Sequence, residues 1–266
     1  MIIIGEKLNS SVQAVRNAIE SMDEDYIANL SVAQSDAGAD YIDINAGAFS
    51  ENEAKHLKWM AEVVVKNTTT SISIDSKNHE AILAALKVNK NGKPLINSIT
   101  DEKYRFDAIA PLVSEFDTSI VALCLDDEGL PETLDDRLKI ANSLVGKLVQ
   151  RGSKPCDIFI DPLVRPVGTG AHYGVQALES IKRIKQEFPE FHIACGLSNI
   201  SFGIPARKLM NQAFLVAAMA NGMDGTILDP LDKRLMSLLL ASDALLGRDK
   251  FCMNYISHYR EGLLEG

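Results

Sequence analysis

Short apolar runs alternate with longer amphipathic stretches along the whole chain. The runs have the length of β-strands, and such an alternation is typical of successive parallel βα units. We predict eight strands, at Ile2–Gly5, Tyr41–Asn45, Ser71–Asp75, Leu95–Ser98, Ser119–Leu123, Asp157–Asp161, His192–Leu197 and Gly225–Leu228.

The stretches between the strands have the period of an α-helix, and several end at Gly or before Pro, as helices do. The predicted helices are Tyr26–Gly38, Ala54–Asn67, Asp107–Glu115, Leu134–Arg151, Val175–Phe188, Ala206–Asn221 and Lys233–Leu246. Eight successive βα units in 266 residues favour an α/β fold of the (β/α)8 TIM barrel type over a doubly wound sheet, although periodicity leaves closure open. Because no linker and no shift in amino-acid composition divides the chain, we predict one domain over residues 1–266.

Composition and charge narrow the class of protein. With 46% hydrophobic and 24% charged residues, the chain can bury one sizeable core. The first five residues are mostly apolar but are followed directly by Glu6 and Lys7, so they are too short for a signal peptide or a membrane-spanning helix. We therefore expect a soluble cytoplasmic protein without a membrane partner. The net charge of −9 and the scattered basic residues argue against nucleic acid and favour a small molecule or a protein as partner.

The cysteines do not suggest a metal or a disulfide framework. Cys124, Cys156, Cys195 and Cys252 stand far apart and form no CxxC pair. We expect buried, reduced thiols at these positions and predict no metal site.

Polar side chains end the predicted strands. In a TIM barrel the ligand site lies at the C-terminal mouth, so these residues should meet there. They are Glu6, Asn9, Asp43, Asn45, Asp75, Ser76, Asn97, Ser98, Asp126, Asp127, Asp161, Ser198, Asn199 and Asp229. Carboxylates and carboxamides predominate, and such a lining suits a flat heterocycle with a donor-rich edge.

A pterin has an edge of this kind, in which N3–H lies beside the 2-amino group. One buried carboxylate can accept both hydrogen bonds, and Asp161 is the natural candidate. Asp75 and Asn97 are then placed to bind the remaining ring nitrogens.

Structural roles compete with ligand binding at several of these positions. Asp75 precedes Ser76-Lys77-Asn78-His79-Glu80, which leads into a helix, and could equally be the N-cap of that helix. Asp101 and Asp229 are better explained as caps or turn residues, because Asp229 precedes a proline. For Asp43 and Asn45, a structural hydrogen-bonding role is as plausible as ligand contact.

Six motifs, in order along nearly the whole chain, resemble those of the methyltetrahydrofolate:corrinoid methyltransferases. They are Ile4-Gly5-Glu6-Lys7-Leu8-Asn9, Asp43-Ile44-Asn45-Ala46-Gly47, Ile74-Asp75-Ser76, Ile96-Asn97-Ser98, Ile160-Asp161-Pro162-Leu163 and Gly196-Leu197-Ser198-Asn199. These enzymes are pterin-binding (β/α)8 barrels, related to the folate module of cobalamin-dependent methionine synthase and to dihydropteroate synthase.

The resemblance implies roles for particular residues. Asp75, Asn97 and Asp161 would bind the pterin, and Asn199 would be the catalytic residue that hydrogen-bonds N5, the methyl-bearing nitrogen. The residues expected around the ring or tail are Asn45, Gly196, Ser198 and Arg207. The chain departs from the family pattern at Lys7, where Arg is usual, and the loop Arg165–Tyr173 matches nothing in it.

The implied reaction moves a methyl group between N5 of tetrahydrofolate or 5-methyltetrahydrofolate and the cobalt of a corrinoid. A neutral carboxamide at Asn199 can assist by a positioned hydrogen bond as charge changes on N5, without titrating itself. The pterin fills the mouth and no Asp-x-His-x-x-Gly cobalt-ligating pattern occurs, so cobalamin should arrive on a separate corrinoid protein. The resemblance also suggests a homodimer and a place in a multi-component anaerobic one-carbon or O-demethylation system, with the physiological direction left open.

Three other functions remain open at this point. A dihydropteroate synthase-like enzyme would be expected to carry Arg and Lys where this chain has Asn199 and Ile200, and an Arg-x-His pair at the eighth strand. A metal-dependent lyase or hydrolase would need a histidine near the carboxylates. We expect the loop Pro162–Gly174 to form a flexible wall of the site. His172 in this loop is the only histidine that we would test for contact with the corrinoid or the substrate. The third alternative is a non-catalytic folate-binding subunit.

Overall fold

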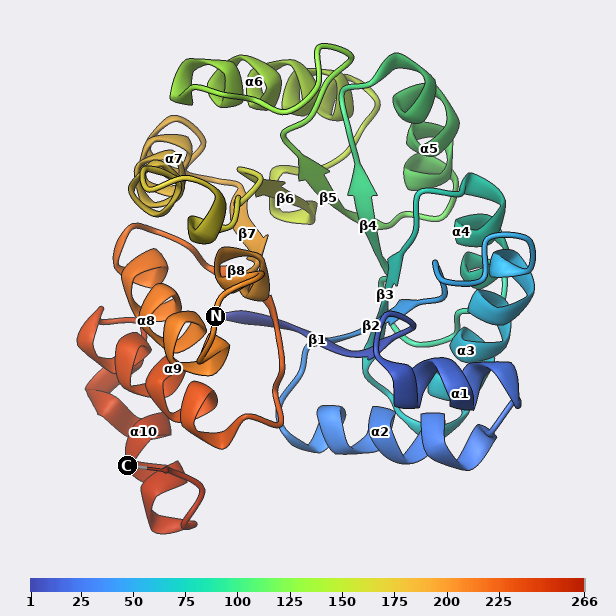
Figure 1. Ribbon diagram of the computed structural model, residues 1–266, viewed down its shortest axis with the longest axis horizontal. Coiled ribbons are helices and arrows are strands. Elements are labelled where there is room, and N and C mark those ends of the chain that lie inside the picture. Colours follow the sequence, from blue (N-terminus) through green and yellow to red (C-terminus); the bar gives the residue numbers. More distant parts are fainter. Residues whose placement is uncertain (266) are drawn as a thin grey trace.

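Eight parallel strands form a closed barrel in the order β1 to β8 (Figure 1). The computed structural model describes residues 1–265. The strands are β1 (Ile2–Asn9), β2 (Tyr41–Asn45), β3 (Ser71–Asp75), β4 (Leu95–Ile99), β5 (Ser119–Leu123), β6 (Ile158–Asp161), β7 (His192–Gly196) and β8 (Gly225–Leu228). Pairing of Ile2–Gly5 with Gly225–Leu228 closes the barrel, so the predicted TIM barrel is confirmed.

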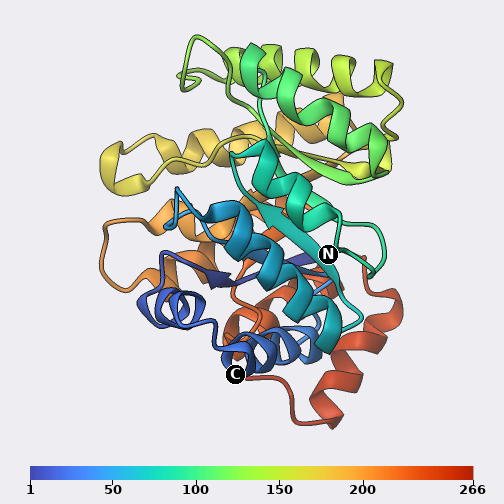
Figure 2. The ribbon, with the colours of Figure 1, turned by 90° about the vertical axis from the view of Figure 1, so that its right-hand side faces the viewer.

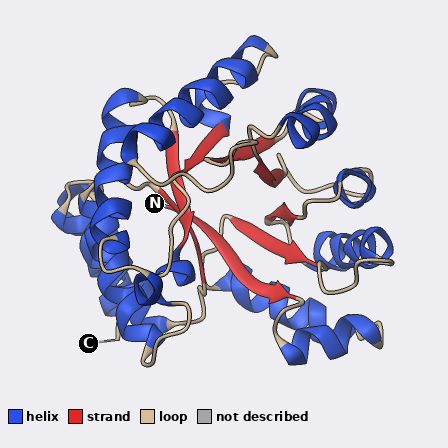
Figure 3. Ribbon diagram, turned by 45° about the horizontal axis from the view of Figure 1, so that its top comes forward, coloured by secondary structure: helices blue, strands red, loops and turns tan. Residues whose placement is uncertain are grey.

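Helices surround the strands (Figure 3). They are α1 (Gln13–Glu20), α2 (Glu24–Asp36), α3 (Glu53–Asn67), α4 (His79–Leu86), α5 (Lys103–Glu115), α6 (Leu134–Gln150), α7 (Tyr173–Glu187), α8 (Arg207–Ala220), α9 (Lys233–Leu245) and α10 (Met253–Arg260). Short 3-10 turns occur at η1 (Pro155–Asp157), η2 (Val167–Thr169), η3 (Leu197–Ser201) and η4 (Lys250–Cys252). Within residues 1–265, no helix combines the length and the apolar composition needed to cross a membrane.

Two layers of apolar side chains hold the barrel together. A large cluster packs the outer faces of the strands against the helices, and Ile42, Ile44 and Ile74 belong to it. A smaller cluster fills the barrel interior, with Phe159 as its largest side chain. A Cβ at Gly225 would lie 3.2 Å from the Phe159 ring, so glycine leaves room for that ring. The filled interior closes the lower part of the barrel, and the polar strand ends lie above it at the mouth.

The two ends of the barrel carry different features. The loops that follow β1 and β8 lie at the mouth, whereas the start of β1 and α10 lie at the opposite side (Figure 2). The Met1 amine pairs with the Asp243 carboxylate at 3.2 Å, which places the end of α9 beside the start of β1. The segment after α9 therefore begins at the end of the barrel remote from the mouth.

The expected burial of the cysteines is confirmed for two and wrong for two. Cys124 and Cys195 are buried behind strand ends, and burial raises the pKa of both thiols. Cys156 and Cys252 are exposed, because both lie in short 3-10 turns outside the packed layers.

Candidate active site at the barrel mouth

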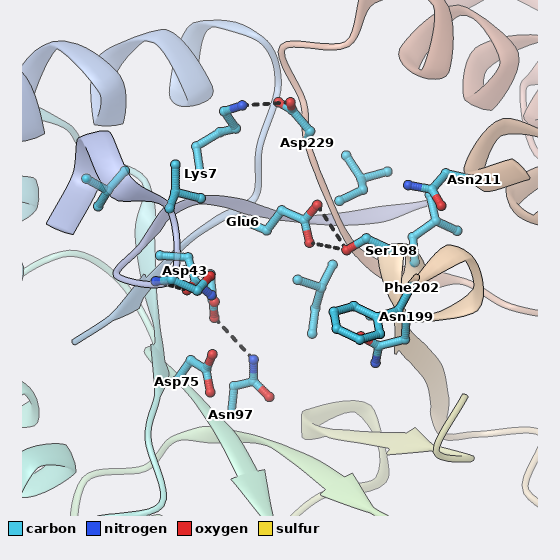
Figure 4. A pocket seen from close by; sticks show the side chains of 18 of the residues that line it. Glu6, Lys7, Asp43, Asp75, Asn97, Ser198, Asn199, Phe202, Asn211 and Asp229 are labelled. Carbon is cyan, nitrogen blue, oxygen red and sulfur yellow. Dashed lines mark hydrogen bonds and ion pairs between the residues drawn. The ribbon is translucent and has the colours of Figure 1, made fainter. Parts of the chain in front are cut away.

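A cavity of about 770 Å³ opens at the C-terminal end of the barrel. Figure 4 shows side chains from β1 to β4 on one side of it and from the β7–α8 connection on the other. Of the residues predicted for the site, those that line the cavity are Asp75, Asn97, Asp161, Gly196, Ser198, Asn199 and Arg207. Asn45 is the one predicted residue that lies behind the lining.

Asn45 holds the Asp75 carboxylate in place. Its amide nitrogen donates to Asp75 Oδ2 at 2.9 Å, while its oxygen accepts from Ser10 Oγ at 2.8 Å. Burial raises the Asp75 pKa, and the Asn45 hydrogen bond opposes this rise. The alternative role of Asp75 as a helix cap is wrong, because Asn78 caps α4 by accepting from the Glu80 amide.

Asp43 fixes the orientation of the Asn97 carboxamide. A single carboxylate oxygen of Asp43 accepts from Ser73 Oγ at 2.5 Å and from Asn97 Nδ2 at 3.2 Å. Burial, followed by the neighbouring Asp75 charge, raises the pKa of Asp43 well above its usual range. With the nitrogen of Asn97 directed at Asp43, its carbonyl oxygen is turned away from that carboxylate (Figure 4). Asn97 can therefore present an acceptor to a ligand.

Asp161 ends β6 at the floor of the cavity and is only 7% exposed. Its Oδ1 accepts from the Leu163 amide at 2.8 Å. Burial raises the Asp161 pKa to about 7, which this one backbone hydrogen bond only partly opposes. Two additional N–H donors from a ligand would stabilise the ionised form.

The segment after β7 brings Asn199 to the opposite wall. η3 starts directly after Gly196, and Asn199 is exposed on it. A Cβ built at Gly196 would lie 3.0 Å from Asn199 Nδ2, so the carboxamide folds back over the glycine. Arg207 anchors η3 because its Nη2 donates to the Ser198 carbonyl at 2.8 Å and its Nε to Ser201 Oγ at 3.1 Å.

Glu6 and Lys7 extend the site along β1. Ser198 Oγ donates to Glu6 Oε2 at 3.1 Å, and burial raises the pKa of Glu6. Lys7, which departs from the family pattern, lines the cavity and pairs with Asp229 at 2.8 Å. Asp229 also accepts from the Leu231 amide at 3.0 Å, which confirms its expected role in a turn.

Arg105 is a cavity residue that sequence reasoning missed. Its Nη2 donates to the Ser98 carbonyl at 2.9 Å, and burial lowers the pKa of its guanidinium. The charge of Asp75 lies close enough to oppose that effect. The predicted start of α5 at Asp107 placed Arg105 in a loop, whereas the helix starts at Lys103 and directs residue 105 to the mouth.

The loop after β6 and its histidine do not form a cavity wall. No residue of Pro162–Gly174 is among those that line the cavity, which corrects that expectation. The His172 ring lies 4.4 Å from the Tyr173 ring, and Arg165 of this loop pairs with Glu132 at 2.9 Å. The loop thus folds over the connection to α6. Over the described chain, no three His, Cys, Asp or Glu side chains are grouped as metal ligands.

Comparisons with known proteins identify the family of this chain. The family model described as pterin binding enzyme matches residues 6–229. The chain is 40% identical over 265 residues to the methylcorrinoid:tetrahydrofolate methyltransferase of Eubacterium limosum, covering 98% of this chain and 97% of that protein. It is 28% identical over 240 residues to methionine synthase of Mycobacterium tuberculosis, covering 85% of this chain and 20% of that longer protein.

Solved structures of dihydropteroate synthase share the fold. The Yersinia pestis enzyme matches with a TM-score of 0.70 at 17% identity, covering 92% of this chain and 93% of that one. Its sulfonamide complex matches with a TM-score of 0.72 at 15% identity, over 93% and 94% of the two chains. At such identities the likeness concerns the barrel alone. The match to the pterin-binding model over most of the chain, together with the full-length relative, confirms the resemblance seen in the motifs, and the chain belongs to the pterin-binding enzyme family.

Proposed function

We propose that the protein is a methyltransferase that moves a methyl group between a corrinoid and N5 of tetrahydrofolate. The observation that carries this proposal is one cavity that holds Asp75, Asn97 and Asp161 on its barrel side and Asn199 on the facing wall. The full-length relative named as a methylcorrinoid:tetrahydrofolate methyltransferase supports the same reaction.

The barrel side of the cavity binds the pterin in this proposal. Asp161 accepts hydrogen bonds from N3–H and from the 2-amino group of the pterin. These donors stabilise its ionised form over the neutral acid. Asp75, held by Asn45, accepts from another ring N–H. Asn97 presents its carbonyl oxygen because Asp43 accepts its N–H. The arrangement is rich in acceptors and therefore selects a ring whose edge consists mainly of donors.

Asn199 acts on the reacting nitrogen. Methylation of N5 by a methylcorrinoid joins the N5 lone pair to the methyl carbon while the cobalt–carbon electron pair stays on cobalt. N5 then carries a positive charge until its proton leaves, and the Asn199 oxygen can accept the N5–H as that charge develops. In the reverse direction the same carboxamide stabilises the departing amine. The absence of a side chain at Gly196 leaves the space that the carboxamide occupies.

Ser198 and Glu6 lie next to this carboxamide and complete the polar wall. The Ser198 hydroxyl donates to Glu6, so its oxygen can accept a hydrogen bond from the cavity. Burial raises the Glu6 pKa, and the hydrogen bond from Ser198 opposes this rise. We propose that Ser198 and Glu6, with Gly196 and Arg207, surround the ring and tail of the folate.

A separate protein supplies the corrinoid in this proposal, because the cavity is committed to the pterin. The printed name of the Eubacterium limosum relative favours transfer from a methylcorrinoid to tetrahydrofolate, so a preceding enzyme must methylate the corrinoid from an external methyl donor. O-demethylation under anaerobic conditions is one process that provides such donors. A homodimer in the cytoplasm is part of the same proposal.

The test mixes the protein with methylcobalamin and tetrahydrofolate and follows the cobalt spectrum by stopped flow. Enzyme-dependent loss of the methylcobalamin bands, together with formation of 5-methyltetrahydrofolate, is the expected result. Tetrahydrofolate binding by calorimetry without any cobalt change, with either free or protein-bound methylcorrinoid, would favour the non-catalytic binding subunit. Condensation of a pterin diphosphate with p-aminobenzoate would favour the dihydropteroate synthase-like alternative.

A further inference from the structure

Phe202 is an exposed aromatic side chain on the wall of the cavity. It follows η3 directly, lines the cavity together with Asn199, and is 66% exposed. Figure 4 shows both residues on the wall formed by the β7–α8 connection. The large apolar side chains of η3 itself behave differently, because Leu197 and Ile200 are each only 1% exposed. A large apolar ring left open at a cavity wall is available to a ligand.

The surrounding chain holds the Phe202 ring in place relative to Asn199. The Phe202 amide donates to the Asn199 carbonyl at 3.2 Å, and the Arg207 guanidinium lies over the ring, 5.9 Å from its centroid. Arg207 is itself held by the Ser198 carbonyl at 2.8 Å. Gly203 follows with a φ of 79°, a conformation that favours glycine, and turns the chain away. A cation therefore lies over one face of the ring, while much of the ring stays open.

The proposed binding mode of the pterin determines where the rest of the folate lies. Asp161 binds the 2-amino end of the bicycle, which leaves Asp75 and Asn97 the long edge that carries N8–H. N5 lies on the other long edge, against Asn199. The p-aminobenzoylglutamate tail of a folate is attached to C6, which is bonded to N5 and is remote from the 2-amino end. The tail therefore leaves the bicycle beside Asn199, on the wall that carries Phe202.

Two other exposed large apolar side chains line the cavity, among the described residues 1–265, but they lie elsewhere. Val12 and Tyr26 are 49% and 38% exposed, and they lie just before α1 and on α2. Around the barrel, α9 lies between these helices and α8, which follows Phe202 (Figure 1). Of the three side chains, Phe202 is the one that shares a wall with Asn199.

We propose that Phe202 forms the subsite for the p-aminobenzoyl ring of tetrahydrofolate and thereby makes the cavity selective for folates over bare pterins. The inference rests on the proposed function, since it takes the pterin to be bound as described. The short methylene–amine link after C6 brings the benzoyl ring to the wall next to Asn199, where it can stack against an aromatic side chain. The carboxylates and carboxamides of the cavity bind the pterin alone as well as the pterin of a folate. Discrimination between the two ligands must therefore come from contacts with the tail.

The experiment compares two ligands by calorimetry, tetrahydrofolate and 6-methyltetrahydropterin, which lacks the benzoyl ring. Phe202→Ala should weaken tetrahydrofolate binding by about 10- to 100-fold, through loss of the aromatic contact and the area it buries, and should leave 6-methyltetrahydropterin binding unchanged. Phe202→Tyr keeps an aromatic ring and should bind tetrahydrofolate as the wild type does. Leu209→Ala is the matched control, because Leu209 is 68% exposed on α8 but is not among the residues that line the cavity. It should change neither affinity.

The two ligands separate failure of this inference from failure of the proposed function. An equal loss of affinity for both ligands in Phe202→Ala, or no loss for either, would overturn the subsite and leave the proposed function intact. A raised KM for methylcobalamin with unchanged tetrahydrofolate affinity would also overturn it, because the ring would then contact the corrinoid. A wild-type protein that binds neither ligand would refute the proposed function together with the inference. Circular dichroism checks that the variants are folded, which substitution of so exposed a side chain should not prevent.

Discussion

Gly196 provides a sharp test of how Asn199 is positioned. Its φ of −69° and ψ of 104° are accessible to any residue, so Gly196→Ala introduces no backbone strain. The added Cβ would lie 3.0 Å from Asn199 Nδ2 and 3.4 Å from its Cγ. The 3.0 Å separation is shorter than ordinary van der Waals contact and the 3.4 Å separation lies at its lower limit, so the carboxamide must move by a few tenths of an ångström.

This displacement sets the size of the expected effect. A misplacement of 1 Å can cost about 100-fold in rate, so a few tenths should cost about 3- to 10-fold, or about 0.7–1.4 kcal/mol. Complete loss of the carboxamide in Asn199→Ala should cost about 100- to 1,000-fold, as for other single donors in such sites. In the double variant the added methyl has no carboxamide to displace, and Gly196→Ala should then have little further effect.

The assay is single-turnover methyl transfer at saturating tetrahydrofolate, with folate affinity measured by calorimetry. Gly146→Ala is the matched control, since a Cβ at that position in α6 meets nothing within 4 Å. Its rate should equal that of the wild type. A wild-type rate of methyl transfer in Gly196→Ala would refute the positional role of the glycine. So would the same loss of rate from Gly196→Ala in the wild type and in the Asn199→Ala background.

Four further predictions concern the barrel side of the site and the interior below it. In the proposed binding mode tetrahydrofolate meets the ionised form of Asp161, whose pKa is about 7. Its affinity should then fall about tenfold per pH unit below that value, and Asp161→Asn should abolish this dependence in calorimetry. Because the Asp161 pKa is raised from 3.8, the stability that this group contributes is present at acid pH and is lost as pH rises toward about 7. The melting temperature of the wild type should therefore fall over this pH range by more than that of Asp161→Asn. Asp43→Leu removes the acceptor that orients Asn97 and should weaken tetrahydrofolate binding about tenfold, because one hydrogen bond of about 1.4 kcal/mol from Asn97 to the ligand is lost. An unchanged dissociation constant would contradict this. Gly225→Ala should destabilise the protein by about 1–3 kcal/mol in urea unfolding through contact with Phe159, and a variant as stable as Gly146→Ala would show that the interior has spare room.

Most strands could be predicted because a parallel strand buried on both faces is apolar throughout. β2, β3, β5 and β8 have the predicted bounds. β1 was predicted to end at Gly5 but continues to Asn9, and its pairing with β2 shifts register between Gly5 and Leu8. Its last residues are polar because they face the mouth, so the apolar pattern stops before the strand does.

Helices were harder to delimit where burial is slight. α1 was not predicted, since its eight residues follow β1 closely and only three of them are buried. α10 was not predicted either, because none of its side chains is buried within the described residues. Such segments have no internal apolar partner whose spacing the sequence could reveal.

The sequence predicts which residues lie at the mouth better than it predicts their hydrogen bonds. Asp75, Asn97 and Asp161 end strands, and the rule that strand ends meet at the mouth places them together. The hydrogen bonds from Asn45 to Asp75 and from Asn97 to Asp43 depend on how neighbouring strands pair, which no local pattern encodes. Arg105 was hidden by an error of one helical turn in the start of α5.

The electrostatics of the mouth separate the proposed reaction from the synthesis of dihydropteroate. A leaving diphosphate needs cations that are free to bind it, and three cations near η3 already have partners. Lys7 pairs with Asp229, Lys208 with Asp232, and Arg207 donates to the Ser198 carbonyl. Burial raises the pKa of four of the carboxyl groups that line the cavity, Glu6, Asp43, Asp75 and Asp161. Each of them therefore gains more from a hydrogen-bond donor than from an anion. A neutral carboxamide at residue 199 suits such a wall, because it can hydrogen-bond N5 in either charge state without adding a charge of its own. The mouth is thereby suited to the proposed methyl transfer, in which no diphosphate leaves and the cavity has to bind hydrogen-bond donors instead of an anion.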